Sequence, residues 1–113
     1  MSGSQATGGD LFAAIPAELP AELTTVLAAA GRVRIERILS DGHASPPGFW
    51  YDQAEAEFVL LVRGGAALEY PGGRRQELSP GQWVHLPAGL RHRVARTEPA
   101  TVWLAVFFPE AAG

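Results

Sequence analysis

The side chains that could carry chemistry in this chain are imidazoles, carboxylates and aromatic rings, because the sequence has three histidines and no cysteine. The absence of cysteine excludes disulfides and thiol chemistry. Among the histidines, His92 follows a turn and opens a segment in which it shares one strand face with Val94. Since Val94 is apolar, we expect this face, and the His92 imidazole with it, to point into the protein interior.

The other two histidines have different surroundings. His85 alternates with Val84 and Leu86, two expected core residues, so its side chain should face outward at the surface or at an interface. His43 lies in a loop, where its imidazole could either swing over a nearby site as an extra ligand or remain solvated.

The segment that leads to His92 carries a recognisable spacing. Gly81, Pro87, Gly89 and His92 fit the pattern G-x5-P-x-G-x2-H, in which Gly81 ends a turn and Gly89 permits a tight reversal. This segment resembles the second conserved motif of the cupin family. It departs from that motif at its last position, where Arg96 replaces an asparagine.

The first cupin motif, H-x-H-x3-4-E-x6-G, is matched only in its second half, by Glu57 and Gly64. Its two histidine positions hold other residues: Tyr51 and Gln53 or, with the longer spacing, Trp50 and Asp52. The resemblance covers roughly residues 32 to 108, with a strong second motif and a degraded first motif.

The resemblance implies a divalent metal ion held in the barrel by Glu57, His92 and Gln53, or by Asp52 in place of Gln53. One imidazole with oxygen donors suits Fe, Mn, Ni or Zn, and the loss of the other imidazoles should weaken binding. The alternative is a metal-free pocket in which His92 forms a hydrogen bond with Glu57.

Three further residues are candidates for binding a substrate. Arg96 has the same strand parity as His92, so it could clamp a carboxylate or phosphate at the barrel rim, or form a salt bridge with a nearby acidic residue. Trp50 and Tyr51 could line the pocket, where aromatic rings give a small ligand a large contact area, or they could fill the core.

From residue 32 onward the sequence predicts closely spaced short strands. Apolar and polar residues alternate over residues 32–39, and further strands are expected at 49–53, 57–63, 66–70, 75–78, 82–87, 91–97 and 101–108. Glycine and proline separate these segments, as is typical of an all-β sandwich or barrel. The resemblance narrows this class to a double-stranded β-helix, the jelly-roll barrel of cupins.

The segment before residue 32 has a different composition. Residues 1–9 are rich in Ser, Gly and Thr and are predicted to form a disordered tail, and residues 10–31 form an N-terminal extension. Within the extension, Pro20, an Ala/Leu-rich run and Gly31 predict one short helix from about Ala21 to Ala29. Residues 32–113 would then form the cupin barrel domain.

The overall charge and composition restrict the class of partner. The net charge is −3 and all nine basic residues are arginines without a basic stripe, which argues against nucleic acid. The apolar stretch over residues 11–30 is interrupted by prolines and glutamates, so we expect no membrane partner and a soluble cytoplasmic protein. Residues 58–62 and 102–108 are apolar on both strand faces, which favours a homodimer.

Two functions follow from these observations. The first is a metal-dependent enzyme, of dioxygenase or isomerase type, that acts on a small molecule in the barrel. The second is a non-enzymatic module that binds a small ligand and whose metal site is degraded or absent. The missing histidines favour the second function, and the retained Glu57 favours the first.

Overall fold

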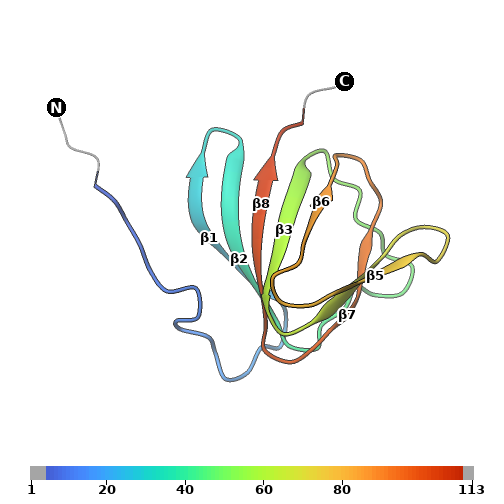
Figure 1. Ribbon diagram of the computed structural model, residues 1–113, viewed down its shortest axis with the longest axis horizontal. Coiled ribbons are helices and arrows are strands. Elements are labelled where there is room, and N and C mark those ends of the chain that lie inside the picture. Colours follow the sequence, from blue (N-terminus) through green and yellow to red (C-terminus); the bar gives the residue numbers. More distant parts are fainter. Residues whose placement is uncertain (1–4, 111–113) are drawn as a thin grey trace.

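The computed structural model describes residues 5–110, which form two antiparallel sheets and no helix. The larger sheet has the strand order β1-β2-β8-β3-β6 and the smaller one the order β5-β4-β7 (Figure 1). The eight strands are β1 (Leu23–Ala30), β2 (Val33–Ser40), β3 (Ala56–Arg63), β4 (Ala66–Glu69), β5 (Arg75–Leu78), β6 (Trp83–Leu86), β7 (Arg93–Thr97) and β8 (Thr101–Phe108). The predicted all-β class is thereby confirmed. No helix in residues 5–110 is long and apolar enough to cross a membrane.

The predicted helix from Ala21 to Ala29 is wrong, because this segment forms strand β1. β1 pairs antiparallel with β2 across a tight turn at Gly31, whose φ of 57° lies in the left-handed region. Gly31 therefore serves as a hairpin residue and not as a helix cap. The Ala/Leu-rich composition favours a helix locally, but pairing with the long strand β2 overrides that weak preference.

The N-terminal extension contributes directly to the larger sheet, since β1 is its edge strand. Ahead of β1, the guanidinium of Arg37 donates hydrogen bonds to the carbonyl oxygens of Leu11 (3.2 Å) and Ala13 (2.6 Å), which fixes the chain against β2. Of the tail predicted over residues 1–9, residues 1–4 lie outside the described residues, and residues 5–9 are exposed and form neither helix nor strand.

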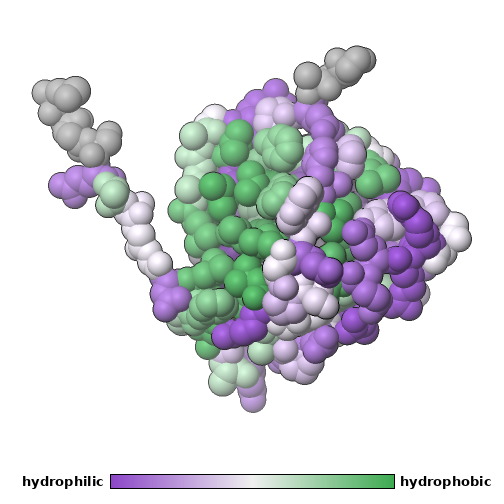
Figure 2. Space-filling model, in the orientation of Figure 1, coloured by the Kyte–Doolittle hydropathy of each residue, from purple (hydrophilic) through white to green (hydrophobic). Residues whose placement is uncertain are grey.

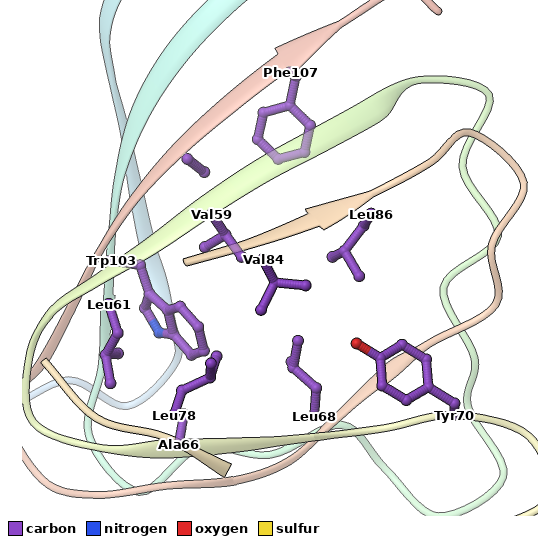
Figure 3. Close-up of a cluster of buried hydrophobic side chains, with 11 residues drawn as sticks. Val59, Leu61, Ala66, Leu68, Tyr70, Leu78, Val84, Leu86, Trp103 and Phe107 are labelled. Carbon is purple, nitrogen blue, oxygen red and sulfur yellow. The ribbon is translucent and has the colours of Figure 1, made fainter. Parts of the chain in front are cut away.

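The hydrophobic core lies between the two sheets (Figure 3). Alternate side chains of β3, β6 and β8 point inward from the larger sheet and meet side chains of β4 and β5 from the smaller one. The buried members are Val59, Leu61, Ala66, Leu68, Tyr70, Leu78, Val84, Leu86, Trp103, Ala105 and Phe107. The core fills only part of the space between the sheets, and the remainder is the cavity described below.

The opposite face of the larger sheet, here called the outer face, is also apolar. Its central side chains are half-buried or exposed in the protomer, and Trp83 stacks on Phe58 with ring centroids 5.3 Å apart. The residues that define the outer face are Phe58, Leu60, Trp83, Leu104 and Val106. Figure 2 shows hydrophobic residues gathered over the larger sheet.

Candidate ligand cavity

A cavity of about 190 Å³ opens between the two sheets. Its floor is apolar, formed by core residues of β3, β6 and β8, and its polar groups come from β1, β2, β3 and the segments before β3 and β7. The lining residues are Glu22, Thr24, Glu36, Ile38, Tyr51, Gln53, Glu57, Val59, Leu68, Leu86, His92, Val94, Trp103 and Phe107. A mostly apolar cavity with a few convergent polar groups is typical of a small-molecule site.

Glu57 and His92 face each other in this cavity. Glu57 is the second residue of β3, and His92 directly precedes β7. The Nε2 atom of His92 lies 4.0 Å from a carboxylate oxygen of Glu57, and both residues are buried, with exposed fractions of 5% and 9%. The structure therefore places side by side the two residues that the cupin motifs indicated as metal ligands. The His92 side chain points inward together with Val94, as expected from their shared strand face.

The backbone around His92 fixes its ring. The main chains of His92 and Tyr51 exchange two hydrogen bonds, and the Tyr51 ring stacks on the imidazole with centroids 5.3 Å apart. The Nδ1 atom of His92 lies 3.0 Å from the carbonyl oxygen of Leu90. A carbonyl oxygen can only accept a hydrogen bond, so Nδ1 carries a proton, and in the neutral imidazole Nε2 then presents a lone pair toward Glu57.

The carboxyl group of Glu57 has an unusual electrostatic environment. Burial raises its pKa from the ordinary value of 4.5 to about 7, and the carboxylates of Glu36 and Glu22 add to the rise. Arg34 opposes the rise in pKa, but its guanidinium is already held by Glu36 (2.7 Å) and Glu55 (2.5 Å). Glu57 itself has no hydrogen-bond partner within residues 5–110. It is a buried carboxyl group that is free to bind a ligand.

Two of the cavity carboxylates, Glu22 and Glu36, were missed by the sequence analysis. Glu36 lines the cavity from β2, and Glu22 lies just before β1, where a helix was expected. The indole Nε1 of Trp103 donates to the Ser40 hydroxyl (3.2 Å), which donates to Glu22 (2.9 Å). This chain of hydrogen bonds runs from the buried Trp103 to the exposed Glu22 and holds the Glu22 carboxylate at the cavity. The alternation of the sequence places Glu36 and Ile38 on the same face of the strand. No neighbouring residue indicated that this face points into the cavity.

The remaining sequence-selected residues divide into two groups. Gln53 and Tyr51 line the cavity, and the backbone carbonyl of Gln53 accepts a hydrogen bond from the Gly89 amide (2.8 Å). Trp50 lies outside the lining, with its ring 5.8 Å from the Arg91 guanidinium. The predicted strand over residues 49–53 is reduced to the single bridge between Tyr51 and His92.

Arg96 does not reach the cavity. Its guanidinium pairs with Glu77 (2.7 Å) and Glu98 (3.4 Å), as in the alternative interpretation of a plain salt bridge. A register shift between β4 and β7 places one extra residue, Ala95, between the ladder partners Val94 and Arg96. Such a bulge breaks the alternation on which the shared parity of Arg96 and His92 was based.

Asp52, His43 and His85 are also outside the cavity lining. Asp52 is exposed, and His43 lies in an adjoining depression where its Nδ1 accepts a hydrogen bond from the Asp41 amide (3.0 Å). His85 faces outward, as expected, with Nε2 3.1 Å from Glu110. These residues add no donor to the pair formed by Glu57 and His92.

The donor set does not fit a tightly held catalytic metal ion. Such ions are usually bound by three protein ligands, of which histidines and carboxylates are the strong ones. Within residues 5–110 no group of three histidine, cysteine, aspartate or glutamate side chains converges closely enough. Glu57 and His92 supply two donors, and Gln53 adds only a neutral amide. We therefore derive no chemical step through a metal at this site.

Sequence comparison identifies the family. Residues 37–107 match the cupin domain family Cupin_2. The chain is a cupin. This match spans the strands β3 to β7, the second half of β2 and all but the last residue of β8, which together provide Glu57, His92 and most of the cavity lining. No curated protein is similar enough to this cupin to count as a match.

Solved structures agree with this assignment. The cupin is 44% identical to a crystal structure from Ralstonia eutropha JMP134 named "putative mannose-6-phosphate isomerase", with a TM-score of 0.89 over 93% of this chain and 100% of that one. A cupin superfamily protein of Desulfitobacterium hafniense DCB-2 is 20% identical, with a TM-score of 0.71 over 85% of this chain and 84% of that one. KdgF from Halomonas sp. is also 20% identical, with a TM-score of 0.69 over 86% and 87%. The last two similarities concern the fold alone.

Proposed function

We propose that this cupin binds a small polar molecule in the cavity between its sheets, with Glu57 and His92 as the groups that contact it. The observation that carries this proposal is the buried Glu57 carboxyl group, which has no hydrogen-bond partner within residues 5–110 and faces His92 Nε2 at 4.0 Å. Because Glu57 lines the cavity, a ligand with hydrogen-bond donors could bind its carboxyl group there.

The rest of the lining supports the same proposal. Tyr51 and Gln53 add polar groups beside Glu57, while Trp103 and Phe107 provide apolar and aromatic surface. A cavity of about 190 Å³ has the size for a small hydroxylated compound such as a monosaccharide or a sugar alcohol. This is the binding-module alternative of the sequence analysis, now supported by the geometry of one defined cavity.

The experiment is a titration of the protein with the neutral sugar alcohol mannitol, followed by amide chemical shifts. Thr24 is exposed and lines the cavity from β1, so Thr24→Trp should obstruct the opening without disturbing the core. Thr25→Trp is the matched control, because Thr25 is also exposed but does not line the cavity. We expect shifts at residues around Glu57 and His92 in the wild type and in Thr25→Trp, and at least a tenfold loss of affinity in Thr24→Trp. Equal binding by both variants would overturn the proposal.

A second candidate function is an isomerase-type proton transfer, for which the state of the two central groups is the specific observation. In its neutral form His92 has a lone pair on Nε2, which can take a proton from a carbon next to a carbonyl group. With a pKa of about 7, Glu57 is partly protonated near neutral pH and can donate its proton to the carbonyl oxygen. His92 then returns its proton to the former carbonyl carbon, while the Glu57 carboxylate takes the proton of the hydroxyl on the neighbouring carbon, which becomes the new carbonyl group. This completes an aldose–ketose interconversion and restores both residues. The 44% identity to the Ralstonia protein, named as a sugar phosphate isomerase, favours this class of reaction.

The isomerase function is tested by incubating the protein with mannose in deuterium oxide. Wild type should exchange the C2 hydrogen for deuterium, and Glu57→Gln and His92→Gln should each slow the exchange by roughly a hundredfold or more. If the wild type exchanges this hydrogen only at the uncatalysed rate, the isomerase function on mannose is excluded, and ligand binding remains as the proposed function.

A divalent metal remains the family-based alternative, with Glu57, His92 and Gln53 as its ligands. Fe, Mn, Ni or Zn would be held by a single imidazole, a single carboxylate and an amide oxygen. Because this set lacks a third strong donor, we expect only weak metal binding.

A further inference from the structure

The charge of the cavity indicates what kind of molecule it accepts. Within the described range 5–110, three carboxylates line the cavity, those of Glu22, Glu36 and Glu57, and no arginine or lysine does so. Among residues 5–110, His92 is the one basic side chain of the lining, and in its neutral form the Nε2 atom presents a lone pair. The cavity therefore offers mainly hydrogen-bond acceptors to its occupant.

The nearby arginines leave no free guanidinium for a ligand, because each is already paired within the protein. Arg34 pairs with Glu36 and Glu55, so it offsets the charge of Glu36, and its guanidinium lies 4.2 Å from the centre of the Phe107 ring. Arg93 pairs with Glu69 at 2.7 Å and also donates to the Ser45 carbonyl oxygen. Neither guanidinium is among the groups that line the cavity.

Of the three carboxylates, Glu57 gives the strongest indication of a ligand. Glu36 accepts from Arg34, and Glu22 accepts from the Ser40 hydroxyl, so both have partners within the protein. The Glu57 residue is only 9% exposed, and its carboxyl group has no hydrogen-bond partner within residues 5–110. A hydrogen-bond donor on the ligand would provide the partner that this carboxyl group lacks. Among donors, a cationic one binds a carboxylate about twice as strongly as a neutral one.

The aromatic part of the lining suits a cation as well. Tyr51, Trp103 and Phe107 contribute rings to the cavity wall. Aromatic faces attract ammonium groups, and the attraction is stronger where water is excluded. A phosphate ester fits this cavity poorly. Its dianion needs arginine, lysine or several N–H donors, and it would be repelled by Glu22 and by the ionised form of Glu57.

We propose that the cavity selects a small protonated amine with hydroxyl groups over its neutral analogue, and that it excludes the corresponding phosphate ester. This inference rests on the proposed function, because it takes the cavity to be the ligand site. The proposed ligand also differs from mannose 6-phosphate, the compound in the name of the Ralstonia protein, because that compound is a phosphate ester.

The test uses three ligands that differ only at one terminal carbon: 1-amino-1-deoxymannitol, mannitol and mannitol 1-phosphate. Each is titrated into the full-length protein at pH 8, with amide shifts of the cavity residues as the readout. We expect the amine to bind at least tenfold more tightly than mannitol and the phosphate to show no binding in the same concentration range. Glu22→Gln should lower the affinity for the amine several-fold and change the affinity for mannitol by less than twofold. Glu98→Gln, at an exposed carboxylate outside the lining, is the matched control and should change neither.

The outcomes separate the two proposals. Equal affinities for the amine and for mannitol, or tighter binding of the phosphate, would overturn the charge selectivity and leave the ligand cavity intact. Binding of none of the three compounds would overturn both. An unchanged amine affinity in Glu22→Gln would show that the cavity carboxylates do not contribute to selection, which also contradicts the inference.

Discussion

The Nε2 atom of His92 lies 4.0 Å from the carboxylate of Glu57, and the two groups come from opposite sheets of the barrel. Glu57 belongs to β3 in the larger sheet, and His92 leads into β7 in the smaller one. The distance between them therefore depends on how the two sheets pack and not on any local contact. The cavity that they share is the centre of the proposed function.

The stability of the protein should depend on pH through Glu57. Its pKa is raised to about 7 in the folded protein, so between pH 4.5 and pH 7 the folded state binds more protons than the unfolded state. The free energy of unfolding must then fall as the pH rises through this window and level off above it. A pKa rise of this size corresponds to a change of about 3 kcal/mol in the free energy of unfolding.

Glu57→Gln removes this dependence because the amide does not titrate. We expect the variant and the wild type to have similar stability near pH 4, and the variant to be more stable at pH 8 by up to about 3 kcal/mol. Urea denaturation at intervals between pH 4 and pH 8 measures the difference, with Glu98→Gln as an exposed control. A constant difference over that range would show that the Glu57 pKa is not raised.

Much of this architecture could be predicted from the sequence, and the reasons for success and failure are physical. From β2 to β8 the strands were predicted because their alternation and their turn residues are local signals. β1 was missed because its strand state depends on pairing with β2, a contact that outweighs local helix preference in a run of alanines.

The site could be predicted only where a local pattern specified it. The motif that ends at His92 located one half of the central pair, and the residual first motif located Glu57. Glu22 depends on the position of β1, which the sequence analysis took for a helix. Arg96 points away from the cavity because of a bulge at Ala95, where the register between β7 and β4 shifts by one residue. A single sequence gives no signal for such a bulge.

Gly64 should tolerate no side chain. Its φ of 92° is in the left-handed region, and a Cβ atom would come within 2.7 Å of the Thr101 Cα. We expect Gly64→Ala to reduce the free energy of unfolding by about 2–4 kcal/mol. Gly89→Ala is the matched control, since its φ is 80° but a Cβ atom there would meet nothing within 4 Å. The control should lose only about 1 kcal/mol in urea denaturation. Equal losses would show that the clash with Thr101 is relieved without cost.

A second imidazole should create the metal site that the wild type only approaches. Gln53 lines the cavity together with Glu57 and His92, so Gln53→His would give three strong donors. We expect Ni or Zn to bind weakly to the wild type and at least tenfold more tightly to Gln53→His, a gain of at least about 1.4 kcal/mol in calorimetry. Adding His92→Ala to that variant should abolish the gain. Equal affinities of wild type and Gln53→His would show that residue 53 cannot reach the metal.

We propose that a second copy of the chain covers the outer face. Trp83 is 60% exposed on this face and stacks on Phe58, beside the apolar residues of β8, and a self-complementary apolar patch of this kind favours a homodimer. Light scattering should give twice the chain mass of 12.0 kDa for the wild type and for Trp83→Phe. Trp83→Glu should give the monomer mass. A monomeric wild type at micromolar concentrations would contradict the dimer.

The carboxyl carbon of Glu57 reports the central claim most directly, because it senses both burial in the cavity and contact with a ligand. Its ¹³C chemical shift can be followed against pH in labelled protein, with and without saturating mannitol. The account predicts a titration midpoint near pH 7 in the free protein and a clear change in both shift and midpoint when mannitol is bound. A midpoint near the ordinary value of 4.5 that mannitol leaves unchanged would contradict it.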